Sequence, residues 1–435
     1  MVGKIVIIAD DLTGGADTGV QFCPFFDETV LVPYHQLPNV FAETGDAASQ
    51  AVSIWTNSRA LQADIARERL KSVASRFSPS KPKWIYKKVD SCLRGNLGAE
   101  IEAVMDTLGF ELSFIAPAFP EMGRTTVNDI HQVYGIPVSQ TEISRDPVAP
   151  VTESRLSQVV AQQSRYKVGH VALDLLGGDQ TRLQKEIVRL ASHGARHIVF
   201  DSFSRDHLDN LSRLLLSSNR RILPVGSAGL AASLGHLLPQ KPGSRKYENR
   251  APVSGNHLLV SGTASQVTKR QMEALVQTYP YEEIILAADL LADCGQRDVL
   301  LKKASDAGSV LSSENVIIRI GSSAKDQTTD SRPKRLRVAE LVAEGLGIFV
   351  AAVLKRCKPG FLFATGGDTA DALLTALNSG GIRILGEIVS GMVEGRLLCG
   401  PMNGLAMITK AGAFGKEDTL VVLHETWEKI RGETT

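Results

Sequence analysis

The stretch "KIVIIADDLTGGADTGVQF", residues 4–22, runs from an apolar segment directly into two adjacent aspartates, Asp10 and Asp11. The β-branched apolar part predicts a buried strand, and the small polar residues after it predict a turn into a helix. Aspartate is a favoured helix N-cap, but one cap accounts for one aspartate only. Two like charges at the end of one strand therefore indicate a site whose chemistry needs carboxylates.

Length and composition limit the classes of protein that this chain can be. At 435 residues it is too long for one ordinary core, so we expect two domains. The formal net charge is +1, which gives no overall field to attract nucleic acid or an acidic membrane. The five cysteines are scattered without a CxxC pair, and we expect reduced thiols in a cytoplasmic protein. No apolar run approaches the roughly 18 residues of a membrane span.

Short β-branched runs alternate with helix-period stretches along the whole chain. This alternation predicts an α/β fold, with two α/β domains whose sheets are largely parallel. A stretch rich in proline, glycine and charge predicts a linker at about 241–255, between domains at 1–240 and 256–435. The expected strands are 4–9, 51–55, 84–89, 112–118, 170–175, 197–201, 221–225, 257–262, 283–287, 315–320, 360–365, 404–409 and 419–423. The expected helices include 61–77, 96–110 and 335–357.

Charged residues follow three of the expected strands in the first half of the chain. They are Asp10 and Asp11, then Arg59, then the group Lys88, Asp90 and Arg94. Each has an ordinary explanation as a helix cap, a surface residue or an ion pair. The carboxyl ends of parallel strands meet at one sheet edge, however, where open α/β sheets bind ligands. Cations that hold a carboxylate and aspartates that accept from hydroxyls would suit a small polyol acid.

Small residues follow three strands in the second half. These turns are Ser261–Thr263, Thr365–Thr369 and Lys410–Gly412. Small residues at a strand-to-helix turn leave backbone N–H groups free and allow phosphate oxygens to approach closely. A tight turn explains any one of them, but three in one domain favour phosphate binding. There is no GxxxxGK[ST] and no GxGxxG, so a P-loop enzyme is excluded and a dinucleotide dehydrogenase loses its main support.

Several longer phrases resemble one known family. They are "IADDLTGGADTGVQF", "YKKVDSCLRGN", "APAFPEMGRTT", "RDPVAPVTES", "VSGTASQVTKRQ", "ATGGDTADAL" and "TKAGAFG". In this order, and through nearly the whole chain, they resemble the four-carbon acid sugar kinases. The resemblance implies an N-terminal sugar-acid-binding domain, a C-terminal ATP-binding domain and an active site in the cleft between them. Such kinases phosphorylate the 4-hydroxyl of D-threonate, D-erythronate or a 3-oxo-tetronate.

The resemblance also implies roles for particular residues. The substrate-binding residues would be Asp11, Arg59, Lys87, Lys88, Val89 and Asp90. We add Asp10, Ser91 and Arg94, which follow the same expected strands, to the expected substrate-binding residues. The ATP-binding residues would be Ser261, Gly366, Gly367, Asp368, Thr369 and Gly412, and we add Thr263 from the same turn as Ser261. We expect Mg²⁺ to accompany ATP and to offset the repulsion between Asp10 and Asp11, with its protein ligands left open.

The catalytic base is expected to be Asp368, with Asp11 as the second candidate. Asp368 follows two glycines at the start of a helix and could also serve as its N-cap. Asp90 lies beside Lys88, which should keep it ionised and make it an orienting group rather than a base.

The phrase "DTGVQF" favours D-threonate or D-erythronate over the oxo-acid, although "GGAD" departs from the family's "GAND" or "GSND". D-threonate is the first expectation, with D-erythronate and 3-oxo-tetronate as alternatives. Two other classes remain: a non-catalytic sensor of sugar acid and nucleotide, and an NAD-dependent dehydrogenase. We expect a sugar acid and ATP as the partners, with no nucleic acid and no membrane, and a homo-oligomer is left open.

Overall fold

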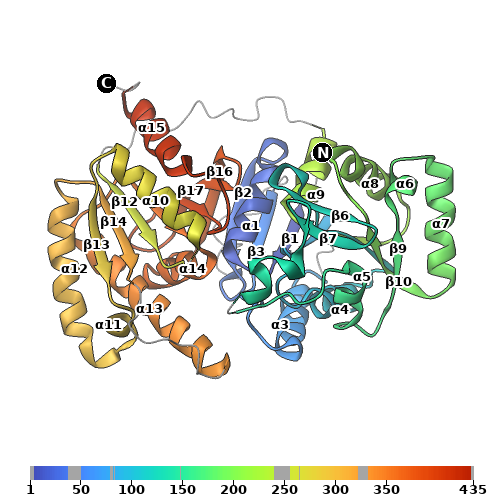
Figure 1. Ribbon diagram of the computed structural model, residues 1–435, viewed down its shortest axis with the longest axis horizontal. Helices are drawn as coiled ribbons and strands as arrows, with labels where there is room; N and C mark the ends of the chain where they lie inside the picture. The colour runs from blue at the N-terminus through green and yellow to red at the C-terminus, as the bar shows by residue number, and fades with distance from the viewer. Residues whose placement is uncertain are drawn as a thin grey trace. The chain divides into compact units, whose positions relative to one another are not determined.

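The computed structural model describes residues 4–37, 50–78, 82, 84–146, 148–239, 255–263, 265–321 and 332–432. The chain forms two compact units (Figure 1). The N-terminal unit comprises Met1–Thr29 with Thr44–Ser244, and the C-terminal unit comprises Val30–Glu43 with Arg245–Thr435. The expected linker at 241–255 lies outside the described residues, except for Gly255.

The N-terminal unit is built on a parallel sheet. Its strand order is β3 (Gln50–Trp55), β1 (Ile5–Ala9), β4 (Trp84–Lys88), β11 (Ile222–Gly226), β5 (Leu112–Ala116), β10 (Ala195–Phe200) and β9 (Lys167–Val171). The central strands are apolar and buried along their length, as expected of parallel strands that are covered on both faces. Ala9 pairs with Trp55 and Ile8 with Lys87, so β3, β1 and β4 end at one edge.

Helices cover this sheet, and a small antiparallel sheet lies beside it. The helices are α1 (Leu12–Gly19), α3 (Ala63–Ser75), α4 (Leu97–Leu108), α5 (Leu156–Ala161), α6 (Leu173–Leu176), α7 (Gln180–Ser192), α8 (Arg205–Ser217) and α9 (Ala228–His236). The small sheet consists of β6 (Arg124–Val127), β7 (Ile130–Val133) and β8 (Ile136–Pro137). One core cluster joins Phe22, Tyr86, Phe114 and Phe200, so strands and helices share their apolar faces.

The C-terminal unit has a mixed sheet. Its parallel part has the order β13 (Glu282–Leu286), β14 (Val316–Ile320), β12 (His257–Ser261), β15 (Phe361–Thr365) and β18 (Ala406–Lys410). The antiparallel strands β17 (Met392–Leu398) and β16 (Gly381–Val389) follow. The helices are α10 (Gln266–Thr278), α11 (Ala288–Ala292), α12 (Arg297–Leu311), α13 (Arg332–Arg356), α14 (Gly367–Ala376) and α15 (Thr419–Gly432). Strand β2 (Glu28–Pro33) comes next to β16 in the order, and from Val30 onward it belongs to this unit.

The predicted α/β class with a largely parallel sheet is confirmed, while two of the expected strands are wrong. The run 419–423 begins helix α15, where Leu420, Leu423 and Trp427 are buried at helical spacing. The run 170–175 divides into the end of β9 and the short helix α6. Strands β2, β6, β7, β8, β16 and β17 are additional to the prediction. Among the described residues, no helix is long and apolar enough to cross a membrane.

Candidate active site

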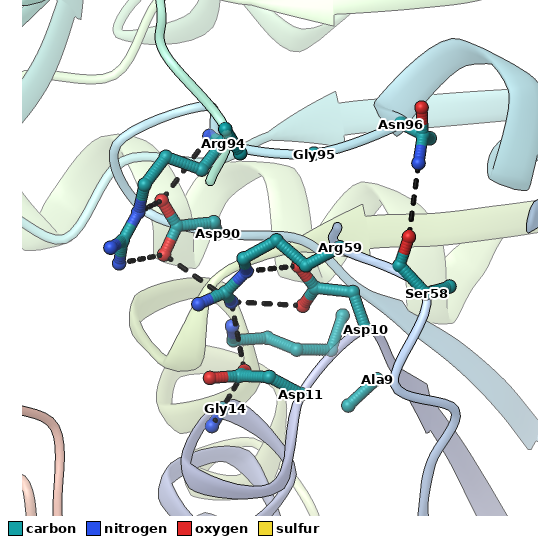
Figure 2. A network of polar contacts seen from close by, with 12 residues as sticks. Ala9, Asp10, Asp11, Gly14, Ser58, Arg59, Asp90, Arg94, Gly95 and Asn96 are labelled. Carbon is teal, nitrogen blue, oxygen red and sulfur yellow. Dashed lines mark hydrogen bonds and ion pairs between the residues drawn. The ribbon is translucent and has the colours of Figure 1, made fainter. Parts of the chain in front are cut away.

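The two aspartates after β1 make different contacts. Asp11 caps α1, because its Oδ1 accepts from the Gly14 N–H at 3.0 Å and its Oδ2 accepts from Thr13 Oγ1 at 2.9 Å. Asp10 faces Arg59 instead, and its two oxygens accept from Arg59 Nε at 2.7 Å and Nη2 at 3.2 Å (Figure 2). Capping therefore explains Asp11, and ion pairing with a neighbouring strand end explains Asp10.

Arg59 lies among three carboxylates. Besides Asp10, its Nη2 contacts Asp11 Oδ1 at 2.8 Å and Asp90 Oδ1 at 3.6 Å. Burial opposes its charge, but these carboxylates hold the pKa of Arg59 well above its usual value. The pKa of Asp10 is lowered against the effect of burial, chiefly by Arg59. The protein's own guanidinium therefore offsets the repulsion between Asp10 and Asp11, where we expected Mg²⁺ to do so.

Asp90 is held by a second arginine. Arg94 Nε and Nη2 donate to its two oxygens at 2.9 and 3.1 Å, and Arg94 Nη1 reaches Asp146 Oδ2 at 3.2 Å. Burial would raise the pKa of Asp90, but Arg94 and then Arg59 hold it well below its usual range. Asp90 is therefore ionised, as expected, although Arg94 contributes more to this than the expected partner Lys88.

The two lysines of β4 have different surroundings. Lys87 is fully buried, and its Nζ donates to Glu100 Oε2 at 2.8 Å, the Lys88 carbonyl at 2.6 Å and the Ile8 carbonyl at 3.3 Å. An ammonium has three N–H donors, so these contacts leave none for a ligand. Lys87 therefore links strand β4 to helix α4, and no sequence pattern indicated its partner Glu100.

Lys88 Nζ has no hydrogen bond or ion pair within the part of the chain that the structure describes, although its side chain is only 3% exposed. It lies over Gly14, because a Cβ on that glycine would be 2.6 Å from Lys88 Nζ and 2.5 Å from Asp11 Oδ1. A real Cβ does not approach other atoms so closely. Gly14 thus allows an ammonium and a carboxylate to sit side by side at the strand ends.

The turn after β4 is supported by a residue that the sequence did not indicate. His131 of β7 bonds the Ser91 carbonyl through Nε2 at 2.8 Å and Thr126 Oγ1 through Nδ1 at 2.9 Å. Burial lowers the pKa of His131 to about 4, so the ring is neutral at pH 7 and its Nε2 carries the proton. The side chain of Val89 is buried, and its N–H donates to the Gly226 carbonyl at 2.9 Å.

The structure brings together the three small-residue turns of the C-terminal unit. A Cβ on Gly262, next to Ser261, would be 2.5 Å from Thr369 Oγ1, and a Cβ on Gly412 would be 2.7 Å from Thr263 Oγ1. Gly366 has φ +97°, which favours glycine, and α14 begins at the next residue, Gly367. The turns after β12, β15 and β18 therefore meet around the N-terminus of a ten-residue helix, which suits a phosphate.

Asp368 is not the N-cap of α14, the ordinary role that its position also allowed. The N-cap of α14 is Gly366, with no side-chain cap bond, and Asp368 is an exposed residue of the first turn. Its carboxylate therefore does not close the helix end. Across the described ranges, we find no group of three or more His, Cys, Asp or Glu residues placed to hold a metal ion.

Family models match both units. A sugar-binding N-terminal domain matches residues 5–234, and a nucleotide-binding C-terminal domain matches residues 258–420. A D-threonate kinase of Salmonella typhimurium is 32% identical over 427 residues, which is 96% of each chain. The chain belongs to the four-carbon acid sugar kinase family. A D-erythronate kinase of Heliobacterium modesticaldum is 30% identical and covers 96% of this chain and 95% of its own.

One more curated relative and two solved structures extend the comparison. A 3-oxo-tetronate kinase of Brucella melitensis is 27% identical over 95% of this chain and 93% of its own. Haemophilus influenzae protein HI1011, a solved structure, aligns with a TM-score of 0.67 at 20% identity, over 97% of this chain and all of its own. A solved structure from Salmonella typhimurium aligns with a TM-score of 0.76 at 21% identity, over 97% and 99% of the two chains. At these identities the solved structures support the fold alone.

Proposed function

We propose that this protein is an ATP-dependent kinase that transfers a phosphoryl group to the 4-hydroxyl of a four-carbon sugar acid, with D-threonate as its first candidate. The observation that carries this proposal is the pair of polar sites. A cluster of ionised aspartates and cations lies at the strand ends of a unit that matches a sugar-binding domain. Three glycine-containing turns meet in a unit that matches a nucleotide-binding domain.

In the N-terminal unit, Lys88 is the best candidate to hold the carboxylate of the acid. Its Nζ makes no hydrogen bond or ion pair among the described residues, although its charge helps to lower the pKa of Asp10 and of Asp90. Arg59 Nε and Nη2, by contrast, already bind aspartates. Asp11 and Asp90 are kept close by and can accept hydrogen bonds from substrate hydroxyls. Arg59, which we first expected to bind the acid directly, would instead act by fixing Asp10 and Asp11.

In the C-terminal unit, ATP would bind at the meeting point of the three turns. The lack of side chains at Gly366 and Gly412 lets Thr263 and Thr369 pack against these turns, and the first turn of α14 offers N–H groups to a phosphate. Mg²⁺ in kinases is bound largely by the phosphates with one or two carboxylates, so it remains part of the proposal as a companion of ATP.

The chemistry requires mainly positioning and charge neutralisation, because phosphoryl transfer asks little covalent work of the protein. The primary 4-hydroxyl must face the γ-phosphate and lose its proton as the new P–O bond forms. Asp90 is held strongly ionised, which makes it a weak base. Asp368, in the first turn of α14, remains the first candidate for the base and Asp11 the second. Transfer would require both ligands to meet, and an active site in a cleft between the domains stays a prediction.

The test is a panel of D-threonate, L-threonate, D-erythronate, L-erythronate and the 3-oxo-tetronates, each assayed with ATP and Mg²⁺ for ADP release. The proposal predicts ADP release that depends on the acid, with the highest kcat/KM for D-threonate. A preference for D-erythronate or an oxo-acid would keep the kinase and change its substrate. Nucleotide and acid binding without ADP release would favour the non-catalytic sensor, and acid-dependent reduction of NAD would favour the dehydrogenase.

A further inference from the structure

The side chain of Lys410, at the end of β18, is buried beneath the small-residue turn Lys410–Gly412, the third of these turns in the C-terminal unit. It is 1% exposed, and its Nζ donates to the Ala411 and Phe414 carbonyls, each at 3.0 Å. Longer contacts reach Thr268 Oγ1 at 3.4 Å and the Gly412 carbonyl at 3.5 Å. No carboxylate lies within ion-pair distance of Nζ among the described residues. Burying an ammonium that contacts only neutral oxygens costs free energy. We therefore infer that the position of this charge serves a function.

The contacts of Lys410 fix the direction of a backbone amide. The carbonyl of Ala411 points at Nζ, and the chain has no cis peptide bond in its described part. In a trans peptide the C=O and the next N–H point in opposite directions, so the Gly412 N–H points away from Lys410. That N–H has no hydrogen-bond acceptor among the described residues.

Helix α10 holds the other side of the same turn. The Gly412 carbonyl accepts from Ser265 Oγ and Thr268 Oγ1, both at 2.8 Å. Gln271 Nε2 donates to the carbonyls of Phe414 at 3.0 Å and Lys416 at 2.7 Å. The carbonyls of Ala411, Gly412 and Phe414 therefore face donors on Lys410 or at helix α10. The Gly412 N–H points the other way and lies beside Thr263.

We infer that Lys410 is a positioning residue of the nucleotide site, whose buried ammonium orients the Gly412 N–H toward a phosphate of ATP and adds a positive charge behind it. This inference rests on the proposed function, because it assigns the turn to a bound nucleotide. Lys410 would support the phosphate-binding turn from its buried side, and it is not one of the turn residues that would contact the phosphate. The positive charge would contribute to binding only in the nucleotide-bound state, in which a polyphosphate lies near it.

The surroundings of Lys410 make its charge sensitive to a bound anion. Burial lowers its pKa to about 7. The groups that face it from β15 and α10, Thr365, Thr268 and Gln271, are uncharged. On β17, Glu394 lies opposite Ile408 and within 4.0 Å of Arg396, and Lys416 of the turn is exposed. Phosphates nearby would favour the charged amine, so ATP binding at pH 8 should take up a proton.

The experiment compares the parent protein with Lys410→Met, which keeps the length of the side chain and removes its donors. ATP binding is measured by calorimetry at pH 8 in two buffers of different ionisation enthalpy, and KM is measured for ATP and for the acid. We expect the Kd for ATP to rise about tenfold or more, the proton uptake to disappear and the KM for the acid to stay within about twofold. Lys416→Met, an exposed lysine of the same turn, is the matched control and should bind ATP as the parent does.

A second variant keeps the test decisive if Lys410→Met does not fold. Thr268→Val removes one donor to the Gly412 carbonyl and should weaken ATP binding severalfold while proton uptake is retained. If Lys410→Met folds, a Kd for ATP and a proton uptake equal to those of the parent would overturn this inference but not the proposed function. If Lys410→Met does not fold, a parental Kd for ATP in Thr268→Val would do the same. A parent protein that does not bind ATP would overturn the proposed function and this inference with it.

Discussion

At the scale of single residues, the site depends on how charges are paired. Asp10, Asp11 and Asp90 share Arg59, while Arg94 holds Asp90 from the other side. The sequence indicated these residue types and their meeting at one sheet edge. It did not indicate which partner each would choose, because pairing depends on side-chain distances that strand order alone does not specify. Lys87 and Lys88 are neighbours in sequence, yet Lys87 Nζ has three partners and Lys88 Nζ makes no hydrogen bond or ion pair among the described residues.

Replacing Arg59 should shift the pH dependence of the protein. In Arg59→Met, Asp10 and Asp90 lose a cation that now lowers their pKa values, so both values should rise. Carboxylates with lowered pKa values stabilise the fold above their unfolded pKa, and this stabilisation is lost as the pH falls through the folded value. The loss should therefore be complete at a higher pH in the variant, with a decrease in the free energy of unfolding of about 3 kcal/mol at pH 7.

The measurement for Arg59→Met is thermal unfolding from pH 3 to pH 7, with the acid limb of kcat/KM recorded alongside. Arg189→Met, which breaks an exposed pair with Glu186 on α7, is the control and should leave both profiles unchanged. An acid limb that coincides with that of the parent would mean that Arg59 does not govern the ionisation of these aspartates.

Removing the ammonium of Lys88 should affect the acid and spare the nucleotide. A charge-assisted bond to a carboxylate contributes on the order of 1.5–3 kcal/mol, so Lys88→Met should raise the KM for the acid by about 10- to 100-fold. The KM for ATP should stay within about twofold. Lys71→Met, an exposed lysine of α3 paired with Glu68, serves as the control. An unchanged KM for the acid would remove Lys88 from the substrate site.

At the scale of secondary-structure elements, strands followed by short turns were the most predictable part. The runs that became β1, β4, β12 and β15 are continuous apolar segments that end in polar or small residues. Strands β16 and β17 alternate with charged and small residues, so their pattern is weaker. The start of α15 contains consecutive β-branched residues, and only the burial of Leu420, Leu423 and Trp427 reveals its helical period.

The glycine turn before α14 provides a test at this scale. Gly366→Ala places a side chain at φ +97°, which should cost about 1–3 kcal/mol in stability and disturb the turn. Gly404→Ala is a matched control, because Gly404 has φ +80° and a Cβ there would meet nothing within 4 Å. We expect both variants to melt at a lower temperature and only Gly366→Ala to bind ATP more weakly, as measured by calorimetry. Equal ATP affinity in the two variants would make the turn purely architectural.

At the scale of the whole molecule, the acid and the nucleotide are proposed to bind to different units of one chain. The alternation of strands and helices was enough to predict the α/β class, and the family resemblance divided the ligands between the halves. The assignment of residues Val30–Glu43 to the C-terminal unit was not predictable, because it depends on pairing between strands that are distant in sequence. The supporting residues Glu100, His131 and Asp146 come from distant segments for the same reason.

The catalytic base belongs to this scale, because it must act when both ligands are present. If Asp368 is the base, Asp368→Asn should reduce kcat by about 10²- to 10⁴-fold and leave the Kd values for ATP and the acid largely unchanged. Asp298→Asn, an exposed aspartate in the first turn of α12, is the control. A near-parental kcat, or a loss of ATP binding alone, would exclude Asp368 as the base and direct attention to Asp11.

The central claim is phosphoryl transfer from ATP to the 4-hydroxyl of a four-carbon sugar acid. The measurement that tests it most directly is proton-coupled ³¹P NMR of the product formed from ATP and D-threonate. A phosphate on the primary 4-hydroxyl couples to two methylene protons, so we expect a triplet that appears together with ADP. A doublet would place the phosphate on a secondary hydroxyl, and an uncoupled signal would mean an acyl phosphate or free phosphate. Either result would rule out transfer to the 4-hydroxyl.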